Sequence, residues 1–586
     1  METLDWLVIG IFFLALIGII VWVVKQKQND SADYFLGGRD ATWLAIGASI
    51  FASNIGSEHL IGLAGAGASS GMAMAHWEIQ GWMILILGWV FVPFYSRSMV
   101  FTMPEFLERR YNPQSRTILS VISLISYVLT KVAVTVYAGG LVFQQVFGIK
   151  ELWGIDFFWI AAIGLVILTA LYTIFGGMKS VLYTSILQTP ILLLGSLIIL
   201  VLGFKELGGW DEMMRICGAV TVNDYGNTMT ELIRSNNDPN FPWLGALIGS
   251  AIIGFWYWCT DQFIVQRVLS GKNEKEARRG TIFGAYLKLL PVFLFLIPGM
   301  IAFALHQKYL GTGGEGFLPM LANGNANADA AFPTLVAKLL PAGVKGLVVC
   351  GILAALMSSL ASLFNSSAML FTIDFYKRFK PNTSEKKLVG IGQMATVAIV
   401  ILGILWIPIM RSVGDVLYTY LQDVQSVLAP GIAAAFLLGI CWKRTSAQGG
   451  MWGLIAGMII GLTRLGAKVY YSNVGDVSSS TFKYLFYDMN WLFFCGWMFL
   501  FCIVVVIAVS MFTAAPSAEK IQGWYSELQL LNKKQLHVRV GINGISFIPL
   551  SSWVLLLLFI GISGKSVCCY DIYPCSIPLK QKLRYE

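Results

Sequence analysis

The chain has 586 residues, of which 56% are hydrophobic and only 12% are charged, and its mean hydropathy is +0.70. A soluble protein of this length needs far more polar surface, so the composition excludes that class and predicts a polytopic membrane protein. The formal net charge of +9 does not indicate a nucleic-acid partner, because the lysines and arginines fall in short segments between apolar runs.

The apolar runs predict an all-α membrane protein. Most runs are about 20 residues long, the length that an α-helix needs to cross a hydrocarbon core. The first run lacks a basic leader and a small-residue cleavage site, so we interpret it as a retained helix and not as a signal peptide. These spans form one predicted transmembrane domain over 1–563, followed by a C-terminal tail at 564–586. About fourteen spans are predicted, near residues 5–24, 41–65, 75–98, 117–145, 157–175, 181–203, 243–266, 279–305, 333–374, 387–409, 417–439, 448–470, 490–512 and 541–563.

The distribution of basic residues predicts the orientation of the chain. Lysine and arginine crowd alternate connections, and the connections between those hold few of them. Since positively charged loops stay on the cytoplasmic side, this bias predicts an N-terminus outside the cell. The protein is expected in the plasma membrane, or in the inner membrane if the cell is bacterial. The basic connections contain Lys25, Lys27 and Arg39; Arg97, Arg109, Arg110 and Arg116; Arg267, Lys272, Lys275, Arg278 and Arg279; Lys377, Arg378, Lys380, Lys386 and Lys387; and Lys443 and Arg444.

The segment SIFASNIGSEHLIG, at 49–62, is polar and contains a glycine where the second span should be uniformly apolar. A helix interrupted at Gly56, beside Asn54 and Ser57, exposes backbone carbonyls that no longer bond within the helix. Carbonyls at membrane depth need a partner, and a dehydrated Na⁺ is such a partner. Transporters commonly coordinate ions with unwound backbone near the bilayer midplane. We therefore interpret the segment as a broken helix that binds an alkali cation.

The ninth span offers a second set of oxygen ligands. Ala355, Ser358 and Ser359 stand at positions i, i+3 and i+4, so they share one face of a helix. One carbonyl and two hydroxyls on that face would complete an oxygen cage with the carbonyls of the broken helix. Hard oxygen ligands without a thiolate or imidazole suit an alkali cation better than a transition metal.

Four ionisable residues fall inside or at the ends of predicted spans: Glu58, His59, Glu78 and Lys288. Burying an unpaired charge is expensive, so we expect these groups to pair with one another or to line a wet cavity. For Lys288 the alternative is that its side chain extends to a membrane interface.

Several long strings resemble the sodium:solute symporters, and within them the sodium–glucose/galactose cotransporter branch. The resemblance runs from about residue 30 to 465 and rests on DYFLGGR, FASNIGSEHLIGLAGAGA, TMPEFLERRY, YWCTDQFIVQRVLSGKN, SSLASLFNSSAMLFTIDFY and APGIAAAFLLGICWKR. It implies a core of ten helices in two inverted five-helix repeats, at about 41–203 and 243–439. The broken helix would be the first core helix, and further helices are added at the ends.

The resemblance also implies which residues bind the cargo. Tyr257 resembles the inner-gate tyrosine that covers the sugar in this family, and His59 resembles a histidine of the animal branch. The implied sodium site consists of the carbonyls of Ala52, Ile55 and Ala355 and the hydroxyls of Ser358 and Ser359. The implied sugar site consists of Asn54, His59, Trp77, Glu78, Tyr257, Trp258, Lys288 and Gln422.

Two positions depart from the family pattern. Ser185 stands where many relatives carry an aspartate beside the ion path, so a second sodium site lacks its negative charge there. Asp261 is the alternative source of that charge. Gly254 stands where relatives place an asparagine or threonine near the sugar, so one sugar contact is expected to be missing.

The leading hypothesis is a Na⁺-driven symporter that imports a hexose of the glucose or galactose type by alternating access. Its partners would be the sugar, Na⁺ as the coupling ion, and the lipid bilayer. One alternative is a sodium-coupled transporter of another polyol such as myo-inositol. Another is a sugar-gated sensor or ion channel on the same scaffold. An enzyme is not expected, because the sequence contains no nucleophile–base set, P-loop or metal-ligand cluster.

Overall fold

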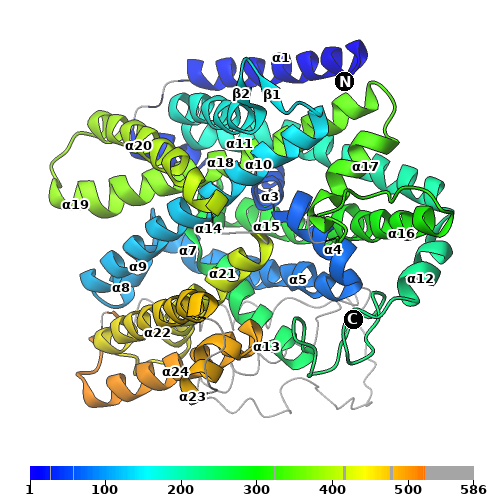
Figure 1. Cartoon of the computed structure of the whole chain (residues 1–586). Helices are drawn as coiled ribbons and strands as arrows, with labels where there is room; N and C mark the ends of the chain where they lie inside the picture. Colours follow the sequence, from blue (N-terminus) through cyan, green and yellow to red (C-terminus); the bar gives the residue numbers. More distant parts are fainter. Residues whose placement is uncertain are drawn as a thin grey trace, which may run out of the picture.

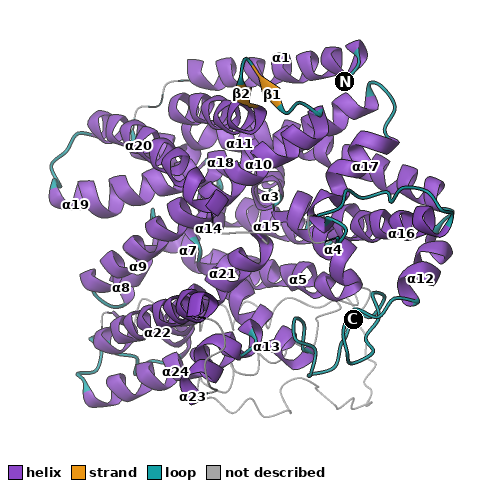
Figure 2. Cartoon of the chain, in the orientation of Figure 1, coloured by secondary structure: helices purple, strands orange, loops and turns teal. Residues whose placement is uncertain are grey.

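The computed structural model describes residues 1–521 except 27, 29, 57, 322–323, 413–416, 475–479 and 519; the side chains at 129–130, 409–412, 417–423 and 473 also lie outside its description. The described chain is almost entirely helical, with one short hairpin of β1 (Glu151–Leu152) and β2 (Ile155–Asp156) (Figure 2). The predicted all-α fold class is therefore confirmed. The predicted span near 541–563 and the tail at 564–586 fall outside the described residues.

The described part contains 10 helices that are long and apolar enough to cross a membrane, and two shorter apolar helices. The exact number of fourteen spans thus stays a prediction. The N-terminal half contains α1 (Thr3–Lys25), α2 (Ser31–Leu36), α3 (Trp43–Asn54), η2 (Glu58–Leu63), α4 (Ala64–Ser70), α5 (Ala75–Ile79), η4 (Gln80–Trp82), α6 (Met83–Ile86), η5 (Leu87–Phe91), α7 (Val92–Ser98), α8 (Met103–Arg110), α9 (Pro113–Ser126), η6 (Tyr127–Val132), α10 (Ala133–Phe147), α11 (Phe157–Leu207) and α12 (Trp210–Gly218). The C-terminal half contains α13 (Trp243–Gly254), η7 (Phe255–Thr260), α14 (Gln262–Leu269), α15 (Glu274–Leu287), η8 (Val292–Leu296), α16 (Ile297–Gly311), α17 (Ala331–Leu339), α18 (Val344–Met369), η10 (Leu370–Tyr376), α19 (Lys377–Phe379), α20 (Glu385–Ser412), α21 (Leu417–Cys441), α22 (Ala447–Val474), α23 (Thr481–Lys483), η11 (Tyr484–Asp488) and α24 (Trp491–Phe512).

The element α11 consists of two spans that the sequence predicts separately, at 157–175 and 181–203. Its 51 residues would extend about 75 Å as one straight helix, more than twice the thickness of a hydrocarbon core. The two spans meet at Gly177, whose φ of 52° lies in the left-handed region. A side chain on this glycine would collide with the carbonyl oxygen of Tyr34, so both the turn and the packing require glycine here.

The predicted run 333–374 is not one span. The short helix α17 ends before Pro341, and α18 begins after Gly343, whose φ is 82°. Proline disfavours helix in the residue before it, and the positive φ of the glycine redirects the chain. The membrane-spanning element is therefore α18 with its continuation η10, and the sequence prediction placed its start too early.

Two helices are interrupted in the middle of their spans. The first interruption follows α3, where Ile55 leaves the helical conformation, and helical structure resumes at Glu58 in η2. The second follows η7, where Asp261 is extended and caps α14 by accepting a hydrogen bond from the N–H of Phe263 at 3.2 Å. They fall in the second and seventh predicted spans, the first span of each of the two predicted five-span repeats. The first break was predicted from the sequence, and the second was not.

The helix α18 lies at the centre of the bundle. Every residue from Ala354 to Met369 is buried, on all sides of the helix. A helix that is buried all round belongs to the core of a large bundle. Its contact with α11 is close: the hydroxyl of Tyr172 donates a hydrogen bond to the carbonyl of Met357 at 2.9 Å. Serines on this helix are therefore held at fixed positions against the first interrupted helix.

The basic connections meet at one end of the bundle. Arg39, before α3, donates hydrogen bonds to the carbonyls of Met99 and Val100, after α7, at 3.1 and 2.9 Å. Arg378 in α19 donates a hydrogen bond to the hydroxyl of Thr117 in α9 at 2.6 Å. Figure 1 shows α8 and α19 at one end of the molecule, and α12 with the N-terminus at the other.

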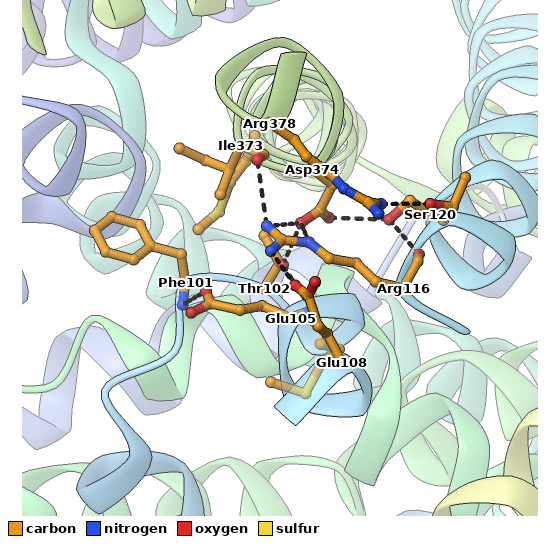
Figure 3. Close-up of polar contacts among 12 residues, drawn as sticks. Phe101, Thr102, Glu105, Glu108, Arg116, Ser120, Ile373, Asp374 and Arg378 are labelled. Carbon is orange, nitrogen blue, oxygen red and sulfur yellow. Dashed lines mark hydrogen bonds and ion pairs between the residues drawn. The ribbon is translucent and has the colours of Figure 1, made fainter. Parts of the chain in front are cut away.

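A buried carboxylate joins three elements at this basic end, and we call the group around it the Asp374 network (Figure 3). Asp374, in η10, accepts hydrogen bonds from the hydroxyls of Thr102 and Ser120 at 2.8 and 3.1 Å. Arg116, in α9, bonds the same carboxylate through Nε at 2.7 Å, and its Nη1 is 2.6 Å from Glu108 in α8. The network therefore connects the entry to α8, the start of α9 and the end of α18.

Candidate functional site

A small polar cavity lies where residues of both interrupted helices meet. Six of the eight predicted sugar-site residues line it, together with four that were not predicted. The predicted residue Glu78 lies behind this lining, bonded to Lys288. The predicted residue Gln422 belongs to α21, and its side chain lies outside the described part of the chain. The lining consists of Asn54, Glu58, His59, Trp77, Gln80, Ile253, Tyr257, Trp258, Lys288 and Gln425.

Three predicted residues form a buried network on one side of the cavity. The ammonium of Lys288 is 2.6 Å from Glu78 Oε2 and 2.9 Å from His59 Nε2, and all three residues are at most 4% exposed. Because an ammonium can only donate, His59 Nε2 is the acceptor and the ring proton lies on Nδ1. Glu78 Oε1, 3.3 Å from Nε2, is then an electrostatic neighbour of the ring. These groups pair, as expected, and Lys288 does not extend to an interface.

Tyr257 stands between the cavity and a second buried ion pair. Its hydroxyl accepts a hydrogen bond from Asn54 Nδ2 at 3.0 Å. Lys131 Nζ is 4.7 Å from the centre of the Tyr257 ring and 2.7 Å from Asp261 Oδ2. Asp261 also accepts a hydrogen bond from the hydroxyl of Tyr127. Tyr257 is therefore held from both sides, by an amide at the cavity and by an ammonium over its ring.

Aromatic rings form another part of the wall. Trp258 is buried, its ring lies edge-on to Tyr257 at a centroid distance of 4.8 Å, and Lys288 Nζ is 5.7 Å from its centre. Trp77 is half-buried, and the centre of its ring is 5.7 Å from the centre of the Trp491 ring in α24. Flat rings of this kind pack against the apolar face of a six-membered ring.

Three buried polar atoms around the cavity have no hydrogen-bond partner among the described residues. They are Asn54 Oδ1, His59 Nδ1 and Gln80 Oε1. Buried polar groups are almost always satisfied, so orphaned atoms at one cavity indicate a bound solute or water that completes them. The set offers two acceptors and, with the tautomer assigned above, one donor.

The space beside Gly254 is occupied by Gln80. A Cβ on this glycine would lie 2.5 Å from Gln80 Oε1. The sequence predicts that a sugar contact is missing at Gly254. In the structure, the side-chain amide of Gln80, from η4, occupies the space beside this glycine. Sequence reasoning missed Gln80 because the glycine and the glutamine are far apart in the chain.

Other site residues were missed although a signal was present. Lys131 is a lone lysine in the apolar run 117–145, and an ionisable residue inside a span is a functional candidate by itself. Gln425 lies three residues after Gln422, so the two share a helix face. Glu58 was noted as a costly charge but was not assigned to the site.

Two of the predicted cation ligands, Ser359 and the carbonyl of Ile55, lie close together at the first interruption. The hydroxyl of Ser359 donates a hydrogen bond to Ser53 O at 2.8 Å. The same hydroxyl oxygen is 3.3 Å from Ile55 O. A Cβ on Gly56 would lie 2.9 Å from Ser359 Oγ, so glycine lets α18 approach the break. Ser358 Oγ is 3.3 Å from Ser185 Oγ.

The remaining predicted ligands, Ala52 and Ala355, are buried on the same two helices. The donor set of carbonyls and hydroxyls fits Na⁺, which prefers hard oxygen ligands. Among the described residues, no group of three or more histidine, cysteine, aspartate or glutamate side chains could hold a metal ion. The carbonyl and hydroxyl oxygens of the predicted site suit a transported alkali cation.

Comparison with known proteins agrees with this geometry. The profile of the "Sodium:solute symporter family" matches residues 34–457. "Sodium/myo-inositol cotransporter 2" of Mus musculus is 37% identical over 550 residues, which cover 91% of this chain and 81% of that protein. "Sodium/glucose cotransporter 1" of Ovis aries is 38% identical over 528 residues, which cover 87% of this chain and 78% of that protein.

A solved structure of a Na⁺-coupled sialic acid symporter, in a substrate-bound outward-open state, has the same fold. It aligns with a TM-score of 0.71 and 22% identity, over 88% of this chain and 99% of that one. This match confirms the predicted fold. Since the family profile spans most of the chain and both relatives align over nearly all of it, the chain belongs to the sodium:solute symporter family, and it is a membrane transporter that couples solute movement to Na⁺.

Proposed function

We propose that the chain imports a hexose of the glucose or galactose type by alternating access, driven by Na⁺. The observation that carries the proposal is the central cavity with its orphaned acceptors Asn54 Oδ1 and Gln80 Oε1 and the orphaned donor His59 Nδ1. Sugar hydroxyls both donate and accept, so they supply the donors and the acceptor that these three atoms lack. The face of Trp258 supports the apolar side of the sugar ring.

A second candidate substrate is myo-inositol, which is favoured by the name of the mouse relative. This solute has the same six-membered ring size but lacks the ring oxygen and the hydroxymethyl group of a hexose. The polar groups of the cavity recognise ring hydroxyls, which both solutes supply.

Uptake into proteoliposomes tests the proposal. We expect radiolabelled glucose or galactose to accumulate only under an inward sodium gradient, and unlabelled myo-inositol to compete more weakly than either hexose. Uptake of myo-inositol alone would replace the hexose by the second candidate. A sugar-evoked current without sugar uptake would instead identify a sensor or channel.

The coupling ion would be held by Ser358, Ser359 and the carbonyls of Ala52, Ile55 and Ala355. Sodium at this position bridges α18 and the first interrupted helix, so it stabilises one arrangement of the two relative to the other. Asn54 belongs to the same interruption, which links cation binding to the sugar cavity. Inward movement of one charge supplies about 2.3 kcal/mol per 100 mV, or about fiftyfold in concentration.

Removing one hydroxyl of the predicted sodium cage should weaken sodium binding more than it lowers the stability of the fold. In Ser359→Ala we expect the sodium concentration for half-maximal uptake to rise about tenfold or more. The matched control is Thr169→Ala, which removes a buried hydroxyl whose one side-chain hydrogen bond among the described residues stays within α11, to Leu165 O at 2.7 Å. Unchanged sodium dependence in Ser359→Ala would reject the cage.

We expect one sodium per sugar. Ser185 supplies a hydroxyl but no charge, and charge is the larger part of holding a second cation in a low-dielectric bundle. Asp261 is already bonded to Lys131 and Tyr127. The reversal potential should shift by about 59 mV per tenfold sugar gradient at fixed sodium, and a shift of about 30 mV would demand two charges.

The proposed orientation places the N-terminus outside the cell in a plasma or bacterial inner membrane. It is supported by the contacts among basic connections at the end of the bundle opposite α12 (Figure 1). Basic loops remain in the cytoplasm, so this end would face inward. Antibody access to an N-terminal epitope in intact cells is the test.

A further inference from the structure

A groove outside the central cavity lies between the start of α5 and the start of α13, with a further wall from the connection 219–242. His76 and Gln80 stand four residues apart on one wall, and Trp243 and Ser250 share one face of α13 on the other. Gln80 also lines the central cavity. This space, which we call the α5–α13 groove, therefore borders the central cavity and shares only that side chain with its lining.

The groove is open on a side that would face lipid. Both of its helices belong to candidate membrane spans, and Trp243 is the first residue of its span. Trp243 is 45% exposed and Ile79 is 36% exposed, although both line the groove. Ile233, on the connection, is 74% exposed beside them. Tryptophan at a span end is typical of a membrane interface, so an apolar molecule can enter the groove from the edge of the bilayer.

One buried nitrogen in the groove lacks a hydrogen-bond partner. His76 donates from Nδ1 to the carbonyl of Ala73, because a carbonyl can only accept. In the neutral ring Nε2 is then an acceptor, and among the described residues nothing donates to it. The ring packs edge-on to Phe241 at a centroid distance of 5.5 Å, which fixes its direction. Buried polar atoms are almost always paired, so Nε2 requires a donor from a molecule in the groove.

The other polar groups near the groove restrict the chemistry of that molecule. The hydroxyl of Ser250 already donates to a carbonyl of its own helix. Gln80 Oε1 is a second orphaned acceptor. Arg234, on the connection, is paired with Asp238 at 3.3 Å, so it leaves no free charge for an anionic headgroup. The occupant must therefore be uncharged and mainly apolar, and it must carry a hydrogen-bond donor.

We propose that the α5–α13 groove binds a membrane sterol, whose hydroxyl donates a hydrogen bond to His76 Nε2 and whose flat rings pack against Trp243 and Phe241. A sterol combines a single hydroxyl with a rigid apolar body, whereas the phosphate and ester oxygens of a phospholipid only accept hydrogen bonds. The face of α13 from Trp243 to Ser250 is about 10 Å long at 1.5 Å per residue. This length accommodates the hydroxyl-bearing rings of the sterol, and its tail would extend into the lipid.

Equilibrium binding of radiolabelled cholesterol to the purified full chain tests the proposal. We expect saturable binding to wild type. Cholesteryl methyl ether has the same body but no hydroxyl proton, so it should compete about tenfold more weakly than cholesterol. His76→Phe should lower the affinity for cholesterol by about tenfold, and His76→Gln, which keeps an acceptor at this place, should recover part of the loss.

A pair of tryptophan variants locates the sterol. Trp243→Ala removes an aromatic wall of the groove and should weaken cholesterol binding several-fold. The matched control is Trp497→Ala, which removes a tryptophan of α24 that is 64% exposed and does not line the groove. This control should leave the affinity unchanged.

Four results would overturn the proposal. They are the absence of saturable cholesterol binding, equal competition by the methyl ether, unchanged affinity in His76→Phe, and an equal loss in the two tryptophan variants. If His76→Phe does not fold, the comparison of cholesterol with its methyl ether on wild type decides. These assays contain no sugar, so a negative result refutes the sterol site and leaves the hexose proposal standing.

Discussion

Replacing Lys288 with alanine is expected to weaken sugar binding by at least about thirtyfold. The ammonium of Lys288 bonds Glu78 and His59, which are both buried, so its removal leaves a carboxylate and an imidazole nitrogen unpaired at the cavity. Leaving such groups unpaired costs roughly 2–4 kcal/mol, a loss of about thirtyfold to several hundredfold in affinity. Equilibrium binding of labelled hexose to detergent-solubilised protein measures the loss.

A double variant separates binding from folding. Breaking a buried ion pair by removing one partner costs about 3–5 kcal/mol of stability, whereas replacing both partners with neutral groups of similar size is often tolerated. Glu78→Gln with Lys288→Met should therefore melt near the wild-type temperature and still fail to bind sugar. If the double variant binds sugar with wild-type affinity, the pair serves only to stabilise the bundle.

The first interrupted helix could be predicted because its signal is local. Polar residues and a glycine at membrane depth need partners wherever the chain places them, so Gly56 and its neighbours indicate a break without any tertiary information. The shared face of Ser358 and Ser359 is equally local, since it follows from helix periodicity. Periodicity does not show which residues face this pair of serines. Only the structure shows that Ser359 reaches the carbonyl of Ile55.

Other features depend on contacts between distant segments and could not be predicted. The second interruption, at Asp261, has no glycine or proline beside it. Its stability comes from Lys131 and Tyr127 on η6, more than a hundred residues earlier. Gln80 fills the space at Gly254 for the same reason: the two positions are adjacent only in the folded chain.

The ion pairs of the site show the same difference between what the sequence indicates and what only the structure shows. The sequence identifies the expensive charges, because any ionisable residue inside a span is costly. It does not identify which carboxylate each lysine neutralises. Once Lys288 is assigned to Glu78 and Lys131 to Asp261, Asp261 is no longer free to replace the charge that Ser185 lacks. The pairing thus bears on the expected stoichiometry.

Replacing Arg116 with alanine is expected to destabilise the whole bundle more than any substitution of an exposed charge. Asp374 is 2% exposed, and Arg116 is its only cationic partner among the described residues (Figure 3). Without the guanidinium, Thr102 and Ser120 still donate to the carboxylate, but the charge is uncompensated and the link to Glu108 is lost. The expected cost is about 3–5 kcal/mol.

Arg109→Ala is the matched control for this prediction. Arg109 lies one helix earlier, is 46% exposed at the side chain and pairs with Glu105 at 2.6 Å in an i,i+4 arrangement. Such exposed pairs contribute about 0–1 kcal/mol. We expect Arg116→Ala to lower the melting temperature of the solubilised protein by several degrees more than Arg109→Ala does. Adding Asp374→Asn should recover part of the loss, because the amide needs no counter-charge. Equal melting temperatures for the two arginine variants would mean that the Asp374 network does not stabilise the junction of α8, α9 and α18.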